Sequence, residues 1–76
     1  MIMIAYAQRG DDEYTLVLEV KSKPRLSDVV KLAGLAESVA RSAFARGRVI
    51  PVLAGVWVGG DVEAYARRWG VEVLKL

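Results

Sequence analysis

The stretch Tyr14-Thr15-Leu16-Val17-Leu18-Glu19-Val20-Lys21-Ser22 decides how the rest of the chain is interpreted. It is rich in β-branched and aliphatic residues, a composition typical of strands. Side chains alternate along a strand, so Glu19 and Lys21 share one face while Leu18 and Val20 share the other. The sequence therefore predicts a strand that directs a carboxylate and an ammonium toward the same point.

An apolar and aromatic segment, Met1 to Gln8, precedes this strand, and the turn-forming residues Arg9-Gly10-Asp11-Asp12-Glu13 join the two. This arrangement predicts an antiparallel β-hairpin. Its register places a residue between Ile2 and Ala5 opposite Glu19. The acidic residues of the turn are then expected at the far tip, roughly 15 Å or more away at ~3.4 Å per residue.

A long amphipathic helix is predicted after Lys21. Lys23-Pro24-Arg25 interrupts the strand, Ser27 is the expected N-cap, and Asp28 is the expected first-turn acid. Apolar residues then recur every three or four positions from Asp28 to about Arg46. Gly47 is expected to end the helix.

Three more elements are predicted in the second half of the chain. Residues 49–58 form a nearly continuous apolar run, which indicates a strand covered on both faces, with Pro51 near its start or at a bulge. A short helix follows over 62–69, with Asp61 as N-cap and Gly70 as C′ residue, and residues 71–76 form the last strand. The order β-β-α-β-α-β, with right-handed crossovers, predicts an α/β fold with a four-stranded mixed sheet and packed helices.

Composition limits the possible functions. The 76 residues allow one domain, and the 54% hydrophobic content is distributed without a run long enough to span a membrane. The chain has no cysteine and no histidine, which excludes thiolate metal sites, disulfides and imidazole catalysis. The remaining chemistry uses carboxylates, lysine, arginine, tyrosine or hydroxyls.

The N-terminus has no pattern of a secretory signal, so we expect a cytoplasmic protein with no membrane partner. Gln8 is the only amide side chain, since asparagine is absent, and this shortage of thermolabile residues is typical of a thermophilic source. The net charge of +2 permits an anionic partner without requiring one.

Glu19 and Lys21 have the residue types that phosphodiester hydrolysis uses. Such reactions use a carboxylate to hold Mg²⁺, usually with a second carboxylate, and a lysine to orient water or neutralise charge. Lys23 and Arg25 lie beside this pair in the sequence and are candidate phosphate contacts. The alternative is a surface ion pair that solvates one side of the hairpin.

Other candidates are weaker. Gly59-Gly60 before a helix is expected to be a plain turn, and the paired arginines Arg67 and Arg68 a solvated helix face. For most of the aromatic residues, including Trp57 and Trp69, packing is expected rather than base stacking.

The segment Tyr14 to Ser22, preceded by a hairpin and followed by a long helix, resembles the (D/E)-x-K half of the PD-(D/E)XK nuclease superfamily, which has the restriction-endonuclease-like fold. Val49 to Val58, Asp61 to Gly70 and Val71 to Lys75 resemble the strand, helix and strand that follow in small archaeal members. The resemblance covers nearly the whole chain. It implies a Mg²⁺-dependent DNA endonuclease in which Glu19 binds the metal and, with Lys21, activates water.

The chain departs from this family in two ways. The family has a helix before the first strand and a metal-binding aspartate across from the glutamate, and neither is found here. The resemblance therefore implies a truncated or degenerate member. Glu37 from the helix, or a residue of a second copy, is then the expected substitute ligand; alternatively, the fold binds nucleic acid without cleaving it.

Two other interpretations remain open. One is a non-catalytic homodimeric interaction module on the same scaffold, favoured by the alternating first strand and by Gly34 and Ser38 on the outer face of the long helix. The other is a fragment whose missing helix and aspartate come from a partner chain.

Overall fold

The computed structural model describes residues 1–76 and contains one mixed four-stranded sheet with the order β1-β2-β3-β4. Its elements are, in chain order, β1 (Ile2–Arg9), β2 (Asp12–Lys21), α1 (Leu26–Ala40), β3 (Arg48–Gly55), α2 (Gly60–Arg68) and β4 (Glu72–Lys75). The predicted element order and sheet type are confirmed.

The hairpin of β1 and β2 forms in the predicted register. Ile2 lies opposite Glu19, and Arg9 lies opposite Asp12 at the tip. Gly10 has a φ of 62°, and a glycine with positive φ at this position is what a type II′ hairpin turn requires. No carboxylate therefore faces Glu19 from β1.

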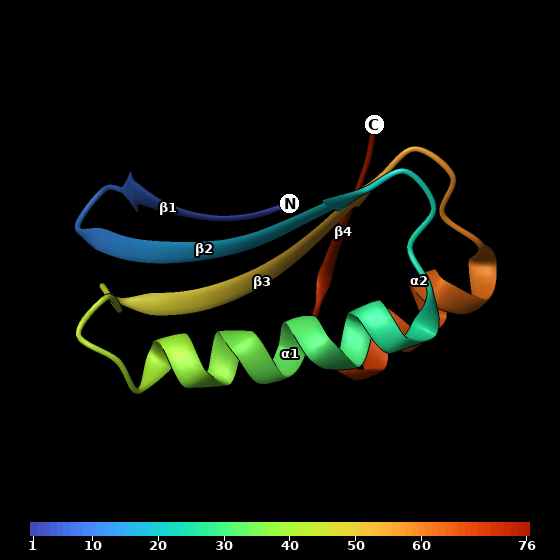
Figure 1. The fold of residues 1–76 in the computed structure, drawn as a ribbon. Coiled ribbons are helices and arrows are strands. Elements are labelled where there is room, and N and C mark those ends of the chain that lie inside the picture. Colours follow the sequence, from blue (N-terminus) through green and yellow to red (C-terminus); the bar gives the residue numbers. More distant parts are fainter.

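The rest of the sheet is parallel, and both helices lie on the same side of it (Figure 1). Each crossover moves one strand further across the sheet, so right-handed connections place α1 and α2 on one face. The core lies between this face and the helices. It consists of Val17, Val29, Leu32, Ala36, Val39, Leu53, Val62, Ala66 and Val71.

The opposite face of the sheet is covered by no helix. Met3 on β1, Leu18 on β2 and Val52 on β3 are neighbours in the pairing register and lie on this face, as does Leu74 on β4. The expectation that β3 is covered on both faces is therefore wrong, since Ile50 and Val52, which lie on the uncovered face, are only half-buried. We call this surface the open sheet face.

The boundaries of α1 differ from the predicted ones. Its N-cap is Arg25, not Ser27, because the backbone N–H of Arg25 donates to Asp28 Oδ2 at 2.7 Å and closes the first turn. The helix ends at Ala40, not near Arg46. Ser42 Oγ donates to the carbonyl of Val39 and accepts the N–H of Phe44, so a side chain replaces the helical backbone bonds there.

The loop after α1 is held against the sheet. The Thr15 hydroxyl donates to the carbonyl of Arg46 at 2.8 Å and accepts its N–H at 2.7 Å. Gly47 follows with a φ of 63°, and a Cβ at this position would overlap the carbonyl oxygen of Glu13. The sharp turn into β3 therefore requires glycine.

β3 is shorter than predicted and ends at Gly55. Val56 and Trp57 leave the sheet, and their N–H groups both donate to the carbonyl oxygen of Ser22, at 3.2 and 2.9 Å. Pro51 lies inside β3, neither at its start nor at a bulge, where β4 has not yet begun to pair. Its missing N–H is tolerated because this half of β3 has only one neighbouring strand.

α2 begins at Gly60 with Gly59 as N-cap, two residues before the predicted cap Asp61, and Gly70 after it has the expected positive φ of 70°. Neither helix is long and apolar enough to cross a membrane.

Candidate functional site

Glu19 and Lys21 lie near the end of β2 on the face that packs against the helices. Ile2 of β1 and Leu53 of β3 flank Glu19 in the sheet. The Glu19 side chain is only 12% exposed, and its Oε1 atom lies 4.0 Å from Lys21 Nζ. The two side chains converge as predicted. The pair is only partly solvated, since the Glu19 carboxylate is largely buried whereas the Lys21 side chain is 44% exposed.

Asp28 brings a second carboxylate to Lys21. It lies in the first turn of α1, its side chain is 10% exposed, and its Oδ1 atom is 3.3 Å from Lys21 Nζ. Its other oxygen accepts the N–H of Arg25. The Lys21 ammonium therefore lies between a carboxylate of the sheet and a carboxylate of the helix.

The charges around Asp28 keep it ionised. Burial by itself raises the pKa of Asp28, but the N–H of Arg25 and the ammonium groups of Lys21 and Lys31 together hold the pKa below its ordinary value of 3.8. The carboxylate is therefore ionised at neutral pH.

Glu19 has an oxygen without a partner. Its Oε1 atom faces Lys21 and also the Met1 amino group at 3.7 Å, whereas Oε2 is buried and has no hydrogen-bond partner. Buried carboxylate oxygens are normally hydrogen-bonded or bound to a cation, and an unpaired one is destabilising. This orphaned oxygen is the feature of the site that its own side chains do not satisfy.

A small cavity of about 110 Å³ adjoins these groups, which we call the Glu19 cavity. Its polar lining consists of Glu19, Asp28, Lys21 and Lys31, and its apolar lining of Ile2, Leu32 and Leu35. No group of three or more His, Cys, Asp or Glu side chains is arranged to hold a metal ion. Mg²⁺ is commonly bound by one or two carboxylates and several waters, so two carboxylates form a sufficient protein donor set.

The structure separates the other predicted residues from this cavity. Glu37 is wrong as a substitute ligand, because its side chain is 69% exposed and pairs with Arg41. Asp28 was assigned only a helix-terminal role from the sequence. Its position in the turn that follows the Glu-x-Lys strand is the one signal that would have identified it.

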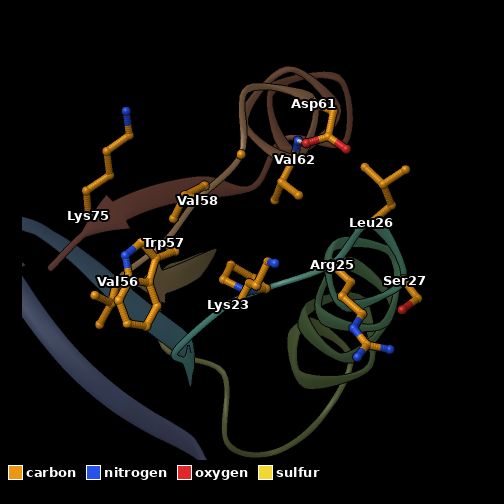
Figure 2. Close-up of a pocket in the computed structure, with 12 residues that line it drawn as sticks. Lys23, Arg25, Leu26, Ser27, Val56, Trp57, Val58, Asp61, Val62 and Lys75 are labelled. Atoms are coloured by element: carbon orange, nitrogen blue, oxygen red, sulfur yellow. Dashed lines mark hydrogen bonds between the residues drawn. The ribbon is translucent and has the colours of Figure 1, made fainter.

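Lys23 and Arg25 line a second, larger hollow of about 790 Å³ at the ends of β2 and β3. Figure 2 shows Lys23 between two walls: Trp57, Val56 and Lys75 form one, and Arg25, Leu26 and Ser27 of the start of α1 form the other. The Gly59-Gly60-Asp61 turn also borders this space through Gly59 and Asp61. We call it the Trp57 groove.

Comparison with known proteins identifies a similar solved structure, that of EndoMS in its apo form. The TM-score is 0.67 at 18% sequence identity, and the match covers 99% of this chain and 32% of the EndoMS chain. This chain therefore shares its fold with part of the EndoMS structure. No family model matches the sequence, and no curated protein matches it. The β-β-α-β-α-β order and the four-stranded mixed sheet are what this similarity covers, and this chain spans about a third of the EndoMS chain.

Proposed function

We propose that this domain binds DNA and that Glu19, Lys21 and Asp28 form a Mg²⁺-dependent phosphodiesterase site of the endonuclease type. The observation that carries the proposal is the position of the Lys21 ammonium between two largely buried carboxylates, 4.0 Å from Glu19 and 3.3 Å from Asp28. The nuclease-like fold supports it. Asp28 takes the place of the aspartate that the resembled family carries opposite Glu19.

The side chains present fit a divalent cation. Glu19 Oε2 is buried without a partner, and carboxylate oxygens are the ligands that Mg²⁺ prefers. Glu19 and Asp28 would hold the ion, and Mg²⁺ supplies Lewis-acid polarisation of a phosphodiester oxygen.

The two lysines of the Glu19 cavity have separate roles in this proposal. Lys21, between the carboxylates, orients the attacking water and neutralises charge that develops on the phosphoryl oxygens. Lys31 lines the same cavity and attracts the phosphate. Lys23 and Arg25 are exposed and form no ion pair, so both are free to contact the DNA backbone.

The experiment is calorimetric titration of Mg²⁺ or Mn²⁺ into the wild type, Glu19→Gln, Asp28→Asn and Glu37→Gln, followed by assays on supercoiled and branched DNA. We expect metal binding to be lost in the first two variants and retained in Glu37→Gln, whose carboxylate is on the solvent side of α1. Lys21→Ala should abolish nicking in a protein that still folds, with lower stability because Glu19 and Asp28 lose their shared cation.

Two results contradict the proposal. If the wild type neither binds metal nor nicks DNA, the proposed enzymatic activity is excluded, and a binding or assembly role remains. If metal binding is lost in Glu19→Gln but unchanged in Asp28→Asn, Asp28 is not a metal ligand.

A second candidate function is a non-catalytic homodimeric module, and the open sheet face is the observation that favours it. Apolar side chains from all strands lie on this face without a covering helix, and Met3 and Leu74 are 46% and 49% exposed. Surfaces of this kind mark interaction sites. A second copy of the chain is the simplest partner, since an isologous contact buries the same patch on both subunits.

Sedimentation of Met3→Glu tests the dimer. We expect this charge on the open sheet face to give a monomer. Ser38→Glu, on the outer face of α1, serves as the matched control and should remain dimeric. A monomeric wild type at all concentrations, or dissociation by Ser38→Glu alone, contradicts a dimer formed through the open sheet face.

A further inference from the structure

Trp57 is the most exposed large aromatic side chain near the proposed site. It is 67% exposed, although the sequence favoured packing for most aromatic residues. The other tryptophan, Trp69, packs near Tyr65 with ring centroids 6.1 Å apart. Trp57 therefore does not contribute to the core, and its large apolar surface is available to a ligand.

The backbone that carries Trp57 is held in place. The Ser22 carbonyl accepts the N–H groups of Val56 and Trp57. Gly55, just before them, lies so close to Pro24 that an added Cβ would be 2.8 Å from the proline Cδ. The indole therefore extends from a backbone segment that is already held in place, so binding a partner there does not require ordering of the loop.

The Trp57 groove combines an apolar interior with a basic rim. Val58, Val62 and Leu26 supply further apolar lining; Figure 2 shows Val58 beside Trp57 and Leu26 on the opposite side of the groove. Lys23 and Arg25 have no acidic partner, whereas Lys75 is paired with Glu63 at 3.0 Å. Asp61, the acidic residue of the rim, accepts the backbone N–H of Val62.

The chemistry of this groove fits a nucleotide with an accessible base face. An exposed indole beside apolar side chains stacks on an unpaired base, and unpaired cations contact the adjacent phosphates. A base inside a duplex is stacked on both faces and offers no free face to an indole. The N-termini of α1 and α2 also lie at the groove, but Asp28 and Asp61 already accept backbone N–H groups there, so Lys23 and Arg25 are the groups left to contact phosphate.

We propose that the Trp57 groove binds an unpaired base of a single-stranded nucleic acid segment, with Trp57 stacked on the base and Lys23 and Arg25 on the flanking phosphates. This inference rests on the proposed nucleic-acid binding and specifies the strand state that the domain prefers. It does not depend on cleavage at Glu19.

Fluorescence of the Trp69→Phe variant, in which Trp57 is the only indole, tests the proposal. The titration uses EDTA and three probes: an oligothymidylate of about ten nucleotides, within the site sizes of single-strand binders, an abasic oligomer of the same length, and the matching duplex. We expect saturable quenching by the oligothymidylate and little quenching by the other two probes. Affinity is then measured by anisotropy of the labelled oligothymidylate.

Trp57→Ala should weaken oligothymidylate binding roughly 5- to 150-fold, the range found for loss of one base–aromatic stack. Trp57→Phe should retain part of the affinity. Phe44→Ala is the matched control, since Phe44 is also exposed (64%) but follows the far end of α1. That variant should bind like the wild type.

Unchanged affinity in Trp57→Ala, or equal affinity for the abasic oligomer, overturns the inference. Unchanged affinity together with a change in sedimentation assigns the groove to a protein partner instead. These outcomes can be distinguished from failure of the proposed nuclease. Quenching in EDTA without metal binding or nicking contradicts only the proposed nuclease activity. Nicking by Trp57→Ala with unchanged affinity contradicts only the proposed base-binding site.

Discussion

Lys21 Nζ lies 3.3 Å from Asp28 Oδ1, and this contact joins the end of β2 to the first turn of α1. The loop between them contains Pro24, which is buried, and the basic residues Lys23 and Arg25, which are exposed. The Lys21–Asp28 pair therefore closes the base of a loop whose charged side chains face outward. It links the two carboxylates of the Glu19 cavity to the residues proposed to contact nucleic acid.

Acid should weaken the fold through Asp28. The folded-state pKa of Asp28 is below 3.8, so its carboxylate stabilises the protein above that pH and the contribution is lost as the pH falls through the folded pKa. Asp28→Asn should be about 1 kcal/mol less stable at pH 7, because it loses the charged partner of Lys21, and should lose less stability on acidification. Urea unfolding from pH 7 to about pH 2 measures both quantities. Parallel pH curves for the two proteins would contradict the role of Asp28.

Salt dependence should identify the phosphate contacts. Lys23→Gln and Arg25→Gln should each weaken single-strand binding and lower the slope of log K against log salt by about 0.7. Anisotropy at several salt concentrations measures this slope. Arg68→Gln, on α2 outside the Trp57 groove, is the control and should leave the slope unchanged. Equal effects of all three variants would mean that binding follows overall charge and not the groove.

Because the core lies on one face of the sheet, two leucines on opposite faces should contribute unequally to stability. Leu53 is fully buried beneath the helices, whereas Leu18 is half-buried on the open sheet face. We expect Leu53→Ala to destabilise the protein by about 2–5 kcal/mol and Leu18→Ala by about 1 kcal/mol at protein concentrations where it is monomeric. Chemical denaturation checks both values. A large effect of Leu18→Ala that grows with protein concentration would indicate that this face is buried between subunits.

Two glycines with similar φ values should differ in the stability they lose when replaced by alanine. Gly10 and Gly47 have φ values of 62° and 63°, but only Gly47 lacks room for a Cβ. Gly10→Ala should lose about 1–3 kcal/mol from the positive-φ backbone alone. Gly47→Ala should lose more, because Glu13 must also move. For a domain of this size each kcal/mol lowers the Tm by about 4–8 °C, so a thermal melt separates the two variants.

Much of the fold was predictable because its signals are local. The hairpin register follows from the turn at Gly10 and the alternation along β2, and both were confirmed. The order of the parallel strands follows from short connections and right-handed crossovers. The Glu19–Lys21 convergence required only that side chains alternate along one strand.

The errors arose where tertiary contacts override local pattern. The periodicity of α1 continues past Ala40, but Ser42 satisfies the backbone groups and Thr15 fixes the loop at Arg46. The apolar run to Val58 predicts a longer strand, but the N–H groups of Val56 and Trp57 donate to the Ser22 carbonyl and not to a neighbouring strand, so the strand ends before them. The sequence alone does not identify Asp28 as part of the site, because its distance from Lys21 depends on how the intervening loop closes.

The Ser22 carbonyl connects the Trp57 groove to the strand end that carries Lys21. Ser22 directly follows Lys21, and its single carbonyl oxygen accepts the N–H groups of Val56 and Trp57. Displacement of the Trp57 loop would therefore break or shift its contacts to Ser22, the residue next to Lys21. A nucleotide bound against the indole and a cation held by Glu19 and Asp28 would therefore both act on the same short segment, Lys21 and Ser22.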